Sequence, residues 1–138
     1  MTLRAFVVDS SFLNRRPRMV SVQSAACAPM VRAFEGKLDH APVWEDPQRT
    51  SAFGLRVPGA LGDFLILRAL YASNGTAIAI AEEELLQGAR DLATQLGLQV
   101  SPEGGACLAA ARRLKNQGWL HPDDQIVLFN TGHGLKYT

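Results

Sequence analysis

The amino-acid sequence predicts an α/β domain: a partial three-layer open sheet, mostly parallel, with helices on both faces. Short apolar runs of strand length alternate with longer amphipathic stretches, which is the order of βαβ units. One run, at residues 76–80, is apolar throughout, as is typical of a strand covered on both faces. The 138 residues suffice for one domain with a core but not for two.

The first half of the chain predicts few regular elements. Apolar and polar side chains alternate at residues 18–23, which favours a strand. A short helix is expected at 28–34, where apolar side chains recur at helical spacing. Residues 37–58 contain three prolines and predict a long surface connection. Residues 1–16 fit neither a strand nor a helix clearly.

Helices and strands alternate in the second half. Helices are expected at 59–74, 82–96 and 102–115, and strands at 76–80, 98–100 and 125–130. Ser101 is the expected N-cap of the last helix. Right-handed crossovers bring the carboxyl ends of parallel strands to one edge. We therefore expect Gln23, Ser101 and Thr131 to lie on the same edge of the sheet.

Composition excludes several classes of function. A formal net charge of +1 gives no electrostatic basis for binding nucleic acid or an anionic membrane surface. No apolar run approaches the roughly 20 residues of a membrane-spanning helix, and the N-terminus is too weak for a secretory signal. Cys27 and Cys107 lack metal-site spacing and are expected to be buried thiols. We expect a cytoplasmic protein without a metal site.

The most informative stretch is Asn130-Thr131-Gly132-His133-Gly134, at the end of the last predicted strand. Open parallel sheets bind ligands at such strand ends, where a hydroxyl is followed by backbone that bends freely. A simple chain reversal explains the two glycines equally well. His133 could act as an acid or base, although a histidine in a turn more often only forms hydrogen bonds.

Two further positions have both a structural and a functional interpretation. Asp63 begins an otherwise apolar helix, so it either caps that helix or points into a site, and the cap is preferred. The segment Ser101-Pro102-Glu103 starts a helix that could attract an anion. Because Glu103 would repel an anion, structural capping is favoured there too.

Several segments, taken together and in order, resemble the C-terminal part of threonine synthases. They are residues 16–23, 27–34, 54–58, 61–67, 101–104 and 128–137. The resemblance covers 16–138 and leaves 1–15 unmatched. It implies half of a fold-type-II pyridoxal-phosphate enzyme. The reaction of that family converts O-phosphohomoserine and water to threonine and phosphate.

The resemblance also implies site residues. Members place a threonine or serine at the position of Thr131, where the hydroxyl bonds the pyridine nitrogen of the cofactor. Gly54 and Glu103 are implied, less directly, to lie near the cofactor cavity. Many relatives have serine at the position of His133, which argues against an essential catalytic role. No catalytic residue is assigned to this chain.

The chain departs from the family in two respects. The Schiff-base lysine and the glycine-rich phosphate loop of the family lie upstream of the strand at 18–23, whereas this chain has only Lys37, Lys115 and Lys136. We therefore expect no covalent cofactor binding and no catalysis by this chain alone. The alternative is a non-catalytic α/β binding or interaction module.

A half-domain also exposes an unpaired parallel sheet edge, which favours association. We expect a homo-oligomer or a complementing chain at that edge, or coverage by residues 1–13.

Overall fold

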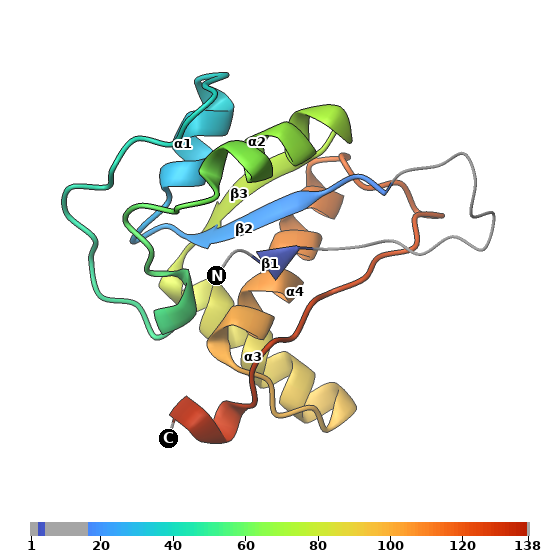
Figure 1. Cartoon of the computed structure of the whole chain (residues 1–138). Coiled ribbons are helices and arrows are strands. Elements are labelled where there is room, and N and C mark those ends of the chain that lie inside the picture. Colours follow the sequence, from blue (N-terminus) through green and yellow to red (C-terminus); the bar gives the residue numbers. More distant parts are fainter. Residues whose placement is uncertain (1–2, 5–16, 138) are drawn as a thin grey trace.

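In the computed structural model, which describes residues 3–4 and 17–137, a small mixed sheet forms the centre of the domain (Figure 1). Its strands are β1 (Leu3–Arg4), β2 (Val20–Ser24) and β3 (Thr76–Ile80), in the order β1-β2-β3. β2 and β3 are parallel and in register from Val20 with Thr76 to Ser24 with Ile80. β1 pairs antiparallel with Ser21 and Val22 of β2.

Helices cover both faces of this sheet, so the predicted α/β class is confirmed. α1 (Pro29–Glu35) and α2 (Asp63–Ala72) lie on one face, and α3 (Glu82–Leu96) and α4 (Pro102–Asn116) lie on the other (Figure 1). Two short 3-10 helices, η1 (Phe53–Leu55) and η2 (Gly134–Tyr137), occur in the long connection and near the C-terminus. None of the described helices is long and apolar enough to cross a membrane.

The larger hydrophobic core lies between the sheet and α4. Val22, Ile78 and Ile80 of the strands pack with Cys107 and Leu114 of α4, all at most 7% exposed. Both cysteines are buried and free, as predicted. A smaller cluster of Met30, Ala33 and Leu67 joins α1 to α2. The sheet is thus held firmly between two layers, which fixes the position of its strand ends.

α3 and α4 pack closely because two glycines face each other. A Cβ added at Gly105 would lie 2.1 Å from the Leu85 carbonyl oxygen, and one added at Gly88 would lie 2.3 Å from that of Gly105. No other residue fits at either position without separating the helices. Arg112 of α4 pairs with Asp91 of α3 beside this contact.

Two predicted strands do not form. Residues 98–100 make only a single antiparallel bridge, from Val100 to His133. Residues 125–130 lie outside every strand and helix of the described part of the chain. An apolar run becomes a strand only when a neighbouring strand accepts its hydrogen bonds. The prediction that residues 1–13 cover the sheet edge lies outside the described residues, apart from β1.

Candidate functional site

A buried carboxylate at the start of α4 defines the candidate site. Glu103 is only 4% exposed, and its Oε1 accepts a hydrogen bond from the backbone N–H of Gly54 at 2.9 Å. Its Oε2 is also buried and has no hydrogen-bond partner among the described residues. The hydroxyl oxygen of Ser101, at the N-cap position of α4, is likewise buried and accepts or donates no hydrogen bond of regular geometry among the described residues. Ser101 thus occupies the predicted position without forming a side-chain cap.

Gly54 reaches this carboxylate because it has no side chain. It lies in η1, within the long connection, and a Cβ there would lie 3.1 Å from Glu103 Oε1. The two residues predicted on different parts of the chain, Gly54 and Glu103, are therefore in direct contact. Because Gly54 and Glu103 are 49 positions apart in the sequence, no local sequence pattern could predict that they are in contact.

The predicted strand end reaches the same end of α4. The N–H of Ser101 donates to the carbonyl of Gly132 at 3.0 Å, and Gly134 N–H donates to the carbonyl of Gln99 at 2.9 Å. Thr131 precedes Gly132 and is exposed, and its hydroxyl makes no hydrogen bond to another described residue. Thr131 therefore precedes a residue that bonds Ser101 directly, but neither Thr131 nor Ser101 lies in a strand of the described sheet, so they do not share a strand edge with Gln23 as predicted.

Tyr137 lies next to Glu103 and Ser101, and the sequence did not predict it as a site residue. Its ring stacks on Phe53 at 6.0 Å between centroids. Burial raises the pKa of Tyr137 to about 12, and the neighbouring carboxylate of Glu103 adds to the rise. The phenol therefore lies within reach of both the Glu103 carboxylate and the Ser101 hydroxyl, and its interaction with Ser101 lowers the pKa of Tyr137 in part. No motif in the sequence marks a tyrosine so close to the C-terminus.

A cavity of about 340 Å³ is lined in part by Gly54. Its walls come from the end of β2, from α1 and from the start of α2, and they include Gln23, Met30, Gly59 and Gly62. This volume falls in the range of small-ligand pockets. The side chain of Gln23 does not point freely into it, because Oε1 accepts hydrogen bonds from Met30 and Val31 N–H at the start of α1.

The remaining candidates have structural roles. Asp63 accepts hydrogen bonds from the N–H groups of Ala41 and Phe64, both at 2.7 Å, as the preferred capping interpretation predicts. The bond from Ala41 is the main reason that the pKa of Asp63 lies below its usual value. His133 is exposed, and its Nδ1 accepts from Leu135 N–H at 3.2 Å.

The part of the chain that the structure describes shows neither a metal centre nor a lysine at this site. The described residues contain no group of three or more His, Cys, Asp or Glu side chains that could hold a metal ion. Lys37, Lys115 and Lys136 are all exposed. None of them lines the cavity beside Gly54.

Curated proteins similar to this chain are mostly threonine synthases. That of Methanocaldococcus jannaschii is 29% identical over 92% of this chain, and that of Methanosarcina acetivorans is 32% identical over 87%. The chloroplastic threonine synthase 2 of Arabidopsis thaliana is 32% identical over 94%. The chain spans 31%, 29% and 25% of the length of these three relatives.

The fold has a relative among solved structures. A threonine deaminase from T.th. superposes with a TM-score of 0.57 at 29% identity, covering 75% of this chain and 35% of that chain. The likeness supports the parallel-sheet architecture of a fold-type-II enzyme. A family model described as pyridoxal-phosphate dependent enzyme matches residues 2–132. The chain therefore belongs to the family of pyridoxal-phosphate-dependent enzymes.

Proposed function

We propose that this chain forms one wall of the pyridoxal-phosphate site of a threonine-synthase-like enzyme. In this proposal the Thr131 hydroxyl bonds the ring nitrogen, and Gly54 and Glu103 border the cofactor. The observation that carries it is the buried carboxylate of Glu103, which Gly54 N–H orients, beside Ser101 and the segment that holds Thr131. A buried carboxylate with few hydrogen bonds is costly, and a bound ligand would offset part of that cost.

The residues present fit a pyridoxal ring in their chemistry. A neutral hydroxyl such as that of Thr131 can donate to or accept from a pyridine nitrogen. The carboxylate of Glu103 is oriented by Gly54 N–H, so only Oε2 is left to accept a bond from a ring substituent. Bound pyridoxal phosphate would supply an electron sink for chemistry at an amino-acid α-carbon. The neutral partner at Thr131 would then set the strength of that sink.

The parent reaction, O-phosphohomoserine and water to threonine and phosphate, is proposed for the complete site. The curated threonine synthases are three to four times as long as this chain, which covers 25–31% of them. Covalent attachment of the cofactor needs a lysine at the site, and the three lysines here are exposed and do not line the cavity beside Gly54. We propose that this chain alone binds the cofactor weakly and releases no phosphate from the substrate.

Equilibrium dialysis with pyridoxal phosphate tests this proposal. We expect saturable binding that weakens about tenfold in Thr131→Val, which corresponds to about 1.4 kcal/mol, or roughly one lost hydrogen bond. Thr76→Val is the matched control, because Thr76 begins β3 at the opposite end of the sheet. It should bind like the unmodified chain.

Borohydride reduction provides the second readout. We expect no cofactor to remain attached to Lys37, Lys115 or Lys136 after reduction and denaturation. A single lysine labelled stoichiometrically would contradict the proposal that the chain lacks the attachment residue. Equal affinities of Thr131→Val and the unmodified chain would contradict the assignment of Thr131.

A second candidate function is that of a non-catalytic α/β interaction module. It is favoured by exposed aliphatic side chains in the segment before the candidate site, with Ile126 47% and Leu128 36% exposed. A homo-oligomer or a complementing chain at this sheet edge would cover them. Light scattering across a concentration series distinguishes the two arrangements, since only the homo-oligomer changes mass without an added partner.

A further inference from the structure

An aromatic side chain of the chain itself lies at the candidate site. The ring of Tyr137, in η2, stacks on that of Phe53, with 6.0 Å between the ring centroids and 10° between the ring planes. The same ring lies near Gly132, because a Cβ added to that glycine would be 4.0 Å from Tyr137 Cε2. The ring therefore contacts both η1 and the segment that follows Thr131.

The phenol hydroxyl of Tyr137 lies in the corner formed by Gly54, Ser101, Glu103 and Gly132. The Glu103 carboxylate, 4% exposed, and the Ser101 hydroxyl, 0% exposed, are both within its reach. Burial raises the pKa of Tyr137 most, Glu103 adds to the rise, and Ser101 opposes it. These signs are those of a phenol that donates to the carboxylate and accepts from the hydroxyl. Tyr137 thus meets the buried polar groups of the candidate site.

Tyr137 presents the same kinds of group as pyridoxal. Both molecules carry a hydroxyl on a flat six-membered aromatic ring, so both need a surface for the ring and polar partners for the hydroxyl. Phe53 supplies the surface for Tyr137, and Ser101 and Glu103 supply the partners. Because close-packed atoms exclude one another, a cofactor ring beside Glu103 and Thr131 would need the space that the Tyr137 ring fills.

The segment that carries Tyr137 can move without the core. η2 has no buried residue, and the N–H of Lys136 bonds locally to the His133 carbonyl at 3.2 Å. A short turn without a buried side chain belongs to the least stable part of a fold, so it rearranges at little cost. Glu103, in contrast, lies in the buried first turn of α4. Tyr137 can therefore leave the corner while Glu103 stays in place.

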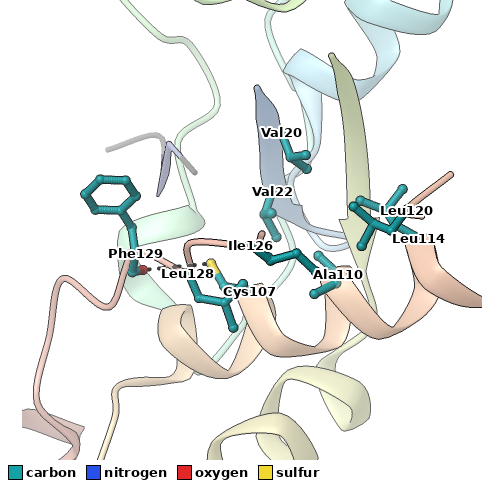
Figure 2. Close-up of a pocket in the computed structure, with 10 residues that line it drawn as sticks. Val20, Val22, Cys107, Ala110, Leu114, Leu120, Ile126, Leu128 and Phe129 are labelled. Atoms are coloured by element: carbon teal, nitrogen blue, oxygen red, sulfur yellow. Dashed lines mark hydrogen bonds between the residues drawn. The ribbon is translucent and has the colours of Figure 1, made fainter. Parts of the chain in front are cut away.

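A second recess beside α4 does not suit the cofactor. Figure 2 shows this apolar groove beside β2, which is lined by Val20 and Val22 of β2, Cys107 and Leu114 of α4, and the segment at residues 120–129. Its volume is about 40 Å³, whereas the cavity beside Gly54 has about 340 Å³. None of the described side chains that line the groove is charged. It therefore offers a phosphate-bearing ring neither room nor polar partners, which leaves the corner at Glu103.

We propose that Tyr137 is an internal competitor of the cofactor: its phenol fills the space beside Glu103 and Ser101, and a bound pyridoxal ring displaces it. This inference rests on the function proposed above and adds a form of regulation to the same site. Only the molecules in which Tyr137 has left the corner can bind the cofactor. The apparent affinity is therefore reduced by the fraction of molecules in that open state.

Equilibrium dialysis with pyridoxal phosphate measures the effect of removing the competitor. Tyr137→Ala should bind about tenfold more tightly than the unmodified chain, as expected if the phenol fills the corner in about nine tenths of the molecules. Tyr137→Phe keeps the ring that stacks on Phe53 and loses the hydroxyl, so it should tighten binding by a smaller factor. Tyr71→Phe is the matched control, because its hydroxyl donates to the Leu38 carbonyl at 3.0 Å. It should bind like the unmodified chain.

The position of Tyr137 provides a second readout. The chain has two tyrosines, so Tyr137 is the remaining one in a Tyr71→Phe background. Its ring signals can then be followed in a carbon–proton correlation spectrum while the cofactor is added. We expect them to move to the positions of a solvent-exposed tyrosine, with the same saturation curve as cofactor binding. In Thr131→Val the same movement should need a higher cofactor concentration.

Two results would overturn this inference and leave the proposed function standing. The first is equal or weaker binding in Tyr137→Ala, with Thr131→Val still weakening it, which would make Tyr137 part of the wall that holds the cofactor. The second is a Tyr137 ring whose signals do not move at saturating cofactor. Absence of saturable binding in both the unmodified chain and Tyr137→Ala would instead contradict the proposed function, and this inference would be overturned with it.

Discussion

At the scale of single residues, Glu103 controls the electrostatics of the candidate site. Its carboxylate is buried, is oriented by one backbone N–H, and lies beside the phenol of Tyr137. A group whose pKa is raised on folding contributes stability below its unfolded pKa and loses it as the pH rises through the folded value. For Tyr137 this window extends from about pH 10 to about pH 12.

Glu103→Gln should lower the pKa of Tyr137. The amide keeps an oxygen for Gly54 N–H but removes the negative charge, so the pKa of Tyr137 should fall below about 12 while burial keeps it above that of free tyrosine. Ultraviolet titration of tyrosinate measures this, in a Tyr71→Phe background that leaves one tyrosine. The exposed Glu83→Gln is the control and should leave the titration unchanged. An unchanged pKa in Glu103→Gln would contradict the contact.

At the scale of elements, the approach of α3 and α4 depends on Gly105. In Gly105→Ala the new Cβ would lie 2.1 Å from the Leu85 carbonyl oxygen and 2.6 Å from Ala89 N, which forces the helices apart. We expect a loss of about 1–3 kcal/mol or more in the free energy of unfolding, measured in urea. Gly59→Ala meets no atom within 4 Å and should change stability little. Equal effects of the two substitutions would show that the helix contact is not tight.

The connection between α1 and α2 is anchored by Asp63. Its pKa is lowered chiefly by the Ala41 N–H, so the stability from this carboxylate is present above about pH 4 and is lost as the pH falls through the lower folded value. Asp63→Ala should cost about 1–3 kcal/mol at neutral pH and should flatten the loss of stability in acid. Urea unfolding at neutral and acid pH measures both. Glu45→Gln, on an exposed part of the same connection, should reproduce neither change.

The sequence predicted those elements whose signal is local. The apolar run at 76–80 forms β3 over the same residues. α3 ends just before Gly97, as predicted, and this glycine has a φ of 67°. The strand expected at 125–130 failed because its apolar alternation carries no information about a hydrogen-bonded neighbour. Glu103 and Gly54 could be placed near each other only through family resemblance, since their contact joins residues 49 positions apart. Tyr137 had no local signal at all.

At the scale of the whole molecule, α4 contributes to two different features of the fold. One contains Gly54, Glu103 and the end of the segment with Thr131. The other is the apolar groove beside β2. The first contains the buried carboxylate of Glu103, where we propose that the cofactor binds.

An amide correlation spectrum of the isotope-labelled chain with increasing pyridoxal phosphate tests whether Thr131, Gly54 and Glu103 form one wall of the cofactor site. We expect saturable shifts at Gly54, Glu103, Thr131 and Gly132. Amides of Gly75 and Gly118, which lie near the start of β3 and after the end of α4, should not move. Saturable shifts confined to residues outside this corner, or no shifts at millimolar cofactor, would contradict the assignment of this wall of the site.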